Sequence, residues 1–186
     1  MLPDSLLAPL ALAFYEAPAD FARRSVLADA LLEAGDPRGE FIALQQHTSA
    51  RARKRAQKLL DRHRAAFLGP LARVVVPGTD VWRGGFLVAC EAQLNGTLAG
   101  EPSWATVERL AVHYDGHEPR ELASPHLRSL RAVSLVLPVA RWTGGAAERL
   151  RHAQSQVYAL LLEGGRAAVA RQGIPWAHLT VRRRAG

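Results

Sequence analysis

The sequence contains very little cysteine. Cys90 is the only one among 186 residues, so an intramolecular disulfide is excluded and a reducing compartment fits. A reactive thiol requires a nearby base and cationic surroundings. The neighbours of Cys90 are apolar, and no partner motif accompanies it. We therefore predict a buried structural thiol.

Long apolar runs are also missing. The uncharged run over residues 5–15 is too short to span a bilayer. The N-terminus carries Asp4 and lacks the basic residues that begin a signal peptide. We therefore expect a cytoplasmic protein with no membrane insertion.

Familiar catalytic motifs are absent as well. The chain has no Gly-x-Ser-x-Gly, no phosphate-loop lysine motif and no Gly-x-Gly-x-x-Gly. The glycine pairs Gly144–Gly145 and Gly164–Gly165 are too short to cradle a phosphate and are typical of turns. We expect no enzymatic activity and no cofactor, and no small-molecule substrate is evident.

One tight group of metal-ligand types occurs, formed by His113, Asp115 and His117. In an extended chain these side chains would point the same way and offer two imidazoles and a carboxylate. The Asp-Gly pair favours a turn at this place, however, and no distant fourth ligand is identifiable. A polar loop after a strand is the preferred interpretation, and no metal site is predicted.

Lysine is scarce in a strongly basic chain. The net charge is +7 and the sequence pI is about 10.6. Lys54 and Lys58 are the only lysines among 24 basic residues. So lopsided a ratio can come from a coding bias toward arginine codons. A positive field would still raise encounter rates with acidic surfaces or nucleic acid.

The first part of the chain has helical periodicity. Helices are expected over residues 5–16, from Asp20, from Asp36 and over 50–67. Gly35 suits a left-handed C-terminal cap, and Asp36 can cap the next helix with Pro37 at its first position. Capping and a local ion pair are the preferred roles of the charged residues here, with binding as the alternative.

This junction resembles a known family. The stretch Val26–Glu33 followed by Gly35-Asp-Pro-Arg-Gly-Glu-Phe-Ile-Ala-Leu-Gln45 is similar to the bacterial repeat-companion domain, and a weaker likeness continues through Leu68–Leu71 and Arg83–Phe86. That small helical module commonly sits just before leucine-rich-repeat-like segments. The resemblance implies no catalytic residue and no cofactor.

The expected helix over residues 50–67 is basic and amphipathic. Ala52, Ala56, Leu59, Leu60, His63 and Phe67 form an apolar stripe, and most basic side chains lie off it. The basic face has three interpretations: a solvated face, a surface that contacts acidic protein or nucleic acid, or a membrane-surface helix. The candidate polyanion contacts are Arg51, Arg53, Lys54, Arg55, Lys58 and Arg62.

Beyond residue 71 the pattern changes to short strands. Segments 107–112, 130–135, 157–162 and 176–181 each have apolar residues at positions one, four and six, as in a leucine-rich repeat. Residues 87–92 form a poorer copy. The asparagine that normally closes each repeat is missing, so an ordinary set of strands with intervening helices is the alternative. The middle positions are Glu91, Ala111, Ser134, Leu161 and Thr180.

These spacings leave room for the crossovers that parallel strands need. The predicted fold is α/β, with an N-terminal helical module (residues 1–70) packed on a short, degenerate leucine-rich-repeat-like parallel sheet with outer helices (residues 71–186). Segments 74–76 and 86–90 are also expected to be strands.

The predicted function is a non-enzymatic protein-interaction module that docks another protein through its sheet or its helical cap. Nucleic-acid or polyanion binding through residues 50–67 and the Arg-rich C-terminus is the alternative. The sheet face could also be covered by the chain itself. The candidate protein interface consists of Arg109, Ala111, His113, Ser134, Leu161, Thr180 and Arg182.

Overall fold

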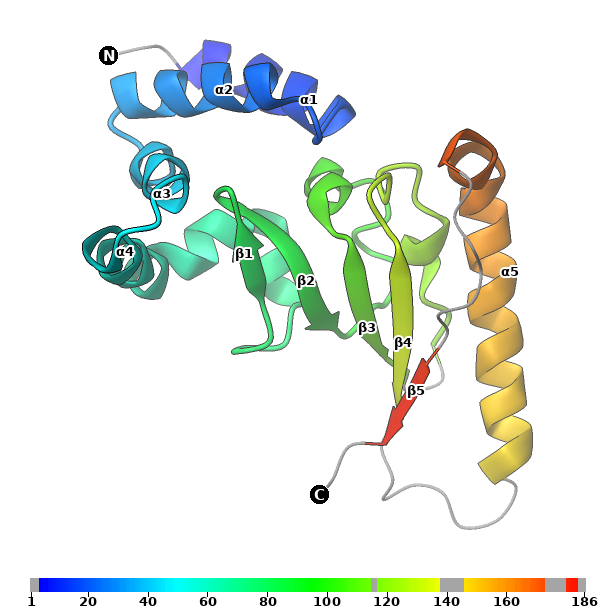
Figure 1. Ribbon diagram of the computed structural model, residues 1–186. Helices are drawn as coiled ribbons and strands as arrows, with labels where there is room; N and C mark the ends of the chain where they lie inside the picture. Colours follow the sequence, from blue (N-terminus) through cyan, green and yellow to red (C-terminus); the bar gives the residue numbers. More distant parts are fainter. Residues whose placement is uncertain (1–3, 115–116, 138–145, 173–179, 184–186) are drawn as a thin grey trace. The chain divides into compact units, whose positions relative to one another are not determined.

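The structure is a computed structural model that describes residues 4–114, 117–137, 146–172 and 180–183. The chain forms two compact units (Figure 1). Unit 1 comprises residues 1–72 and 81–88, and unit 2 comprises residues 73–80 and 89–186. The predicted division placed the boundary after residue 70, whereas here unit 1 extends to residue 72 and also includes the short segment 81–88.

Unit 1 contains the four helices expected from the sequence. They are α1 (Asp4–Glu16), α2 (Phe21–Glu33), α3 (Pro37–Gln45) and α4 (Ala50–Leu68), and the 3₁₀ turn η1 (Gly69–Arg73) follows α4. Asp20, Asp36 and Ser49 cap α2, α3 and α4 by accepting backbone N–H groups at the helix starts. Gly35 ends the α2 region with a positive φ of 76°.

Aromatic side chains form the core of unit 1. The Phe14 and Phe86 rings lie 4.2 Å apart, and Phe41 stacks on Phe67 at 5.2 Å with Trp82 against both rings. Phe86 and Trp82 come from a hairpin of β1 (Val81–Arg83) and β2 (Phe86–Ala92). Sequence-distant aromatics therefore tie the hairpin to the helices of unit 1.

Unit 2 is built on parallel strands. In this unit residues 89–92 of β2 are followed across the sheet by β3 (Arg109–His113), β4 (Ala132–Leu137) and β5 (Thr180–Arg183). The pairs β2–β3, β3–β4 and β4–β5 are all parallel. A single antiparallel bridge joins Val75 to Ala92, so the expected strand over residues 74–76 is reduced to that bridge.

Helical connections lie between the strands of unit 2. They are the 3₁₀ turns η2 (Pro102–Thr106) and η3 (Arg120–Ala123) and the helix α5 (Ala146–Gln172), which runs alongside the sheet (Figure 1). Leu110, Val112, Val133 and Leu135 are buried on the strands, and Ala153, Val157 and Leu160 are buried on α5. The fold is thus mixed α/β.

Two predictions fail within α5. Residues 157–162 were expected to form a strand, but they lie in the middle of the helix. Gly164 and Gly165 were expected to form a turn, and they are also helical. The buried residues Ala153, Val157 and Leu160 have the spacing of one helix face, which explains the outcome.

The remaining predicted strand, 176–181, is described only from Thr180 onward. Gly144–Gly145 lies outside the described residues. Within the described part of the chain, no helix combines the length and apolar character needed to cross a membrane.

Candidate functional site

The sheet face of unit 2 gathers most of the predicted interface residues. The register sets Ala111 opposite both Glu91 and Ser134, and it sets Ser134 opposite Thr180. Four of the five predicted middle positions therefore form one row across four strands. Because side chains alternate along a strand, this row occupies one face of the sheet.

The centre of this face is small and partly accessible. Ala111 and Ser134 are half-buried, and Arg109 is exposed at the start of β3. The backbone of β5 places Arg182 opposite Val136; the side chains of Thr180 and Arg182 lie outside the described residues. Leu161 was wrongly placed in this set, because it lies on α5 and not on a strand.

A polar pair lies on the same face. The Nε2 atom of His113 is 2.7 Å from Oε2 of Glu91, and the two side chains are 12% and 34% exposed. Glu91 is opposite Ala111 in the register, which puts it diagonally across from His113. The sequence showed both residues but not their pairing, because that depends on the register of β2 against β3.

His113 also belongs to the group of metal-ligand residue types that the sequence contains, together with Asp115 and His117. Asp115, part of the predicted polar loop, lies outside the described residues. Among the residues that the structure describes, no group of three or more His, Cys, Asp or Glu side chains could hold a metal ion.

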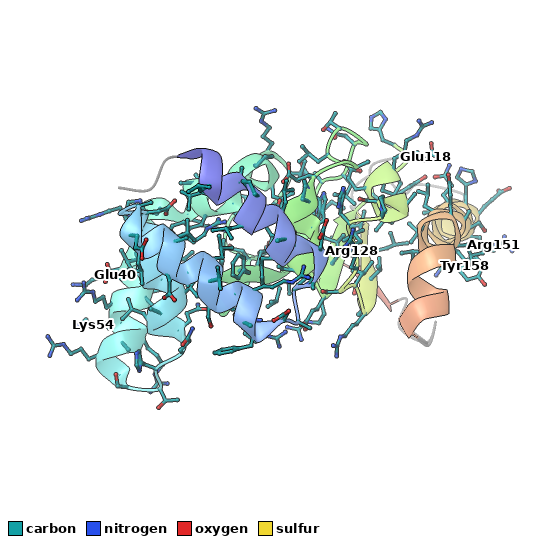
Figure 2. The ribbon with its side chains drawn as sticks, turned by 90° about the horizontal axis from the view of Figure 1, so that it is seen from above. Glu40, Lys54, Glu118, Arg128, Arg151 and Tyr158 are labelled. Carbon is teal, nitrogen blue, oxygen red and sulfur yellow. The ribbon has the colours of Figure 1, made fainter. Side chains whose placement is uncertain are left out.

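The basic face of α4 is the second candidate surface. All six candidate polyanion contacts are exposed, as the helical periodicity predicts: Arg51, Arg53, Lys54, Arg55, Lys58 and Arg62. Arg55 forms an ion pair with Glu40 of α3. Figure 2 shows Lys54 extending away from the helices. Arg64, which the same periodicity would expose, is only half-exposed.

The α2–α3 junction has the capping geometry that its sequence predicts. The Asp36 carboxylate accepts the backbone N–H of Arg38 at 2.8 Å. A Cβ on Gly39 would lie 2.6 Å from the backbone N of Leu32, so glycine permits α2 and α3 to approach closely. The Arg38 guanidinium lies over the Phe67 and Phe86 rings, at 5.3 and 5.9 Å from their centroids.

Cys90 is buried in β2, as predicted. Burial is the main cause that raises the pKa of the Cys90 thiol from 9.0 to about 12, and the charges of Asp80 and Glu91 act in the same direction. The thiol is therefore protonated at neutral pH. These surroundings are unlike those that activate a nucleophilic cysteine.

One buried carboxylate was not predicted from the sequence. Glu121, in η3, is fully buried, and it accepts backbone N–H groups from Asn95, Gly96 and Leu98. The bond partners are more than twenty residues away in the chain, and no motif around Glu121 signals them. Its role in the described structure is to hold a loop of unit 2.

The chain has no significant match among protein-family models, curated proteins or solved structures. The resemblance to the repeat-companion domain therefore rests on the sequence motif alone.

Proposed function

We propose that this chain is a non-enzymatic interaction module that docks a partner protein on the sheet face of unit 2. The proposal rests on one observation: Glu91, Ala111, Ser134 and Thr180 stand in one row across four parallel strands. Such a row provides a continuous surface that no single segment of the chain could form.

The row also supports a degenerate leucine-rich-repeat-like arrangement. Three of the four segments that carry a row position have the same apolar spacing, and residues 87–92 form a poorer copy. Repeats of this kind bind partners on the face of their parallel sheet. The segments that carry the repeat-companion resemblance all fall within unit 1. Both features are consistent with a helical module that accompanies a repeat-like segment.

The chemistry of the face favours protein over nucleic acid. A protein interface combines a less polar centre with a polar rim. Here Ala111 and Ser134 occupy the centre, while Arg109 and the His113–Glu91 pair lie on the same face. A nucleic-acid groove would require a basic track, whereas this face carries arginine only near its rim, with Arg109 at the start of β3 and Arg182 on β5, among the described residues.

Two substitutions test this surface. Ala111→Glu and Ser134→Arg each put a large charged side chain in the centre of the row. Ala159→Glu is the matched control, because Ala159 is exposed on α5. Affinity capture from native lysate, quantified by mass spectrometry, should lose the same partner with both row variants and retain it with the control. If the row variants fold and still capture the partner, the interface lies elsewhere.

A second function is favoured by the basic face of α4. Five of its six exposed basic residues have no ion pair with any residue that the structure describes; the exception is Arg55. Uncompensated positive charge along one exposed helix supports binding of nucleic acid or another polyanion. This function would use unit 1 and leave the sheet face unoccupied.

Neutralising the unpaired arginines tests polyanion binding. The triple variant Arg51→Gln, Arg53→Gln and Arg62→Gln should weaken binding to random-sequence DNA and RNA. It should also reduce the dependence of log Kd on log salt by roughly 0.7 to 0.9 per lost phosphate contact. The control replaces Arg73, Arg131 and Arg151 with glutamine, because these exposed residues lie outside α4. Equal losses in both triple variants would indicate a nonspecific effect of net charge.

A further inference from the structure

A cavity of about 500 Å³ lies within unit 1, at the α2–α3 junction. Its walls come from α1, α2, α4 and the junction itself, which contributes Asp36, Pro37 and Arg38. This volume is within the range of about 300 to 1,000 Å³ that is typical of small-molecule sites. Part of the motif that carries the family resemblance therefore faces a space that a ligand could occupy.

The wall is mostly apolar. Leu7, Tyr15, Leu27, Leu31 and Phe67 line the cavity, together with small alanines that keep it open. Leu27, Leu31 and Phe67 are buried members of the unit 1 core. The walls are thus suited to an apolar chain or ring and are supported by packed residues behind them.

Arg38 gives the cavity a cationic group. Its guanidinium lies over the Phe67 and Phe86 rings, and these two contacts restrict its position. Among the described residues it has no ion pair with a carboxylate. Asp36 lines the same cavity, but its carboxylate accepts the backbone N–H of Arg38 as part of the helix cap.

These observations define the charge of a matching ligand. A guanidinium binds a carboxylate through two parallel hydrogen bonds. A doubly charged phosphate would face the Asp36 carboxylate on the same wall, so a single negative charge is favoured. His63, which is stacked on Phe67, also lines the cavity and is the second nitrogen-bearing side chain among the residues of its wall.

We propose that the cavity binds a small organic monocarboxylate with an apolar tail, with its carboxylate on Arg38 and its tail among Leu7, Leu27 and Leu31. This site lies within unit 1 and does not depend on the proposed interface of unit 2. It also gives Arg38 a role that helix capping does not require.

Octanoate is a suitable probe, used in calorimetric titrations of the 186-residue chain. We expect saturable binding of one octanoate per chain. 1-Octanol should bind at least about tenfold more weakly, because a charge-assisted hydrogen bond contributes about 1.5 to 3 kcal/mol. Acetate, which lacks the apolar tail, should show no saturable binding. Absence of octanoate binding, or equal binding of octanol, would overturn the proposal.

Variants of Arg38 test the position of the carboxylate. Arg38→Gln should weaken octanoate binding about 10- to 100-fold. Arg38→Lys keeps the charge without the planar fork and should lie between Arg38→Gln and the unsubstituted protein. The matched control Arg53→Gln removes an exposed arginine outside the cavity and should leave binding unchanged. If both glutamine variants bind octanoate equally well, the carboxylate is not on Arg38.

A cavity-filling pair of variants provides a test that leaves the charged residues intact. Ala66 is exposed and lines the cavity, so Ala66→Phe should obstruct the ligand without burying a new group in the core. Ala65 is exposed on the same helix but does not line the cavity, which makes Ala65→Phe the control. We expect loss of octanoate binding in the first variant only. Normal binding by a folded Ala66→Phe variant would place the ligand elsewhere.

Discussion

The buried Glu121 carboxylate holds the loop that contains Gly96: its Oε2 accepts the Gly96 backbone N–H at 2.9 Å. Its other oxygen accepts longer hydrogen bonds from Asn95 and Leu98. Because Glu121 is fully buried, removing its carboxylate would leave these three backbone N–H groups without the acceptor that the fold provides. This one side chain therefore joins η3 to a loop more than twenty residues earlier in the sequence.

We predict that Glu121→Ala lowers the free energy of unfolding by about 3 kcal/mol or more. Urea unfolding followed by circular dichroism would measure the loss. The control is Glu118→Ala, since Glu118 is exposed and its ion pair with Arg120 should contribute less than about 1 kcal/mol. Similar free energies of unfolding for the two variants would show that the hydrogen bonds of Glu121 do not stabilise the fold more than the exposed ion pair does.

Gly85 is predicted to tolerate no side chain. It has a φ of +85°, and a Cβ there would lie 2.1 Å from Cγ1 of Ile42. Gly85→Ala should therefore destabilise the protein by more than Gly35→Ala, which has a φ of +76° but open space around it. Holding alanine at a positive φ should cost about 1 to 2 kcal/mol in both variants, and the steric clash should add about 1 to 3 kcal/mol at Gly85 alone. Thermal and urea unfolding of the two variants would check this order.

Asp36 should contribute as a helix cap. We predict that Asp36→Ala lowers the free energy of unfolding by about 1 kcal/mol, because the Arg38 N–H loses its acceptor. Asp29→Ala is a suitable control, since Asp29 is exposed within α2 and lies outside its first turn. Unchanged stability in Asp36→Ala would argue against the capping role.

Local backbone chemistry was the most predictable part of this fold. The Gly35-Asp36-Pro37 junction follows from the conformational range of glycine, the acceptor of Asp36 and the fixed φ of Pro37. The parallel pairing of β2, β3 and β4 also followed, since repeated apolar spacing put Glu91, Ala111 and Ser134 in equivalent positions.

The same spacing failed at residues 157–162 for a physical reason. Apolar residues at positions one and four are three residues apart, a spacing that also suits a helix face. Val157 and Leu160 of this segment continue the buried helix face that includes Ala153, so α5 runs through it. Leu161 is therefore not part of the candidate interface.

The sequence patterns did not predict which residues pair across separate elements. The Glu121 loop contacts, the His113–Glu91 pair and the position of Arg38 over two aromatic rings each join residues from separate elements. Nothing in the local spacing of these residues specifies their partners. The cavity that Arg38 lines could therefore not be predicted from the sequence, because side chains of four packed helices form it.

Ionisation of the Cys90 thiol should lower the stability of the protein at alkaline pH. Its pKa in the folded protein is raised, from 9.0 to about 12, chiefly because burial disfavours the thiolate. The stabilising contribution of the neutral thiol is therefore fully present below about pH 9 and is lost as the pH rises toward 12. Within that window the unfolded state releases the proton first. The free energy of unfolding should fall by up to about 1.4 kcal/mol per pH unit from this group.

Comparison with Cys90→Ala isolates this effect from the titration of other side chains. Urea unfolding at several values between pH 8 and pH 11 should give a steeper decline for the unsubstituted protein than for the variant. Alkylation with iodoacetamide at pH 8 should also be slow in the folded state and fast in urea, because only unfolding exposes the thiol and permits its ionisation. Parallel pH curves, or rapid alkylation of the folded protein, would contradict a buried thiol with a raised pKa.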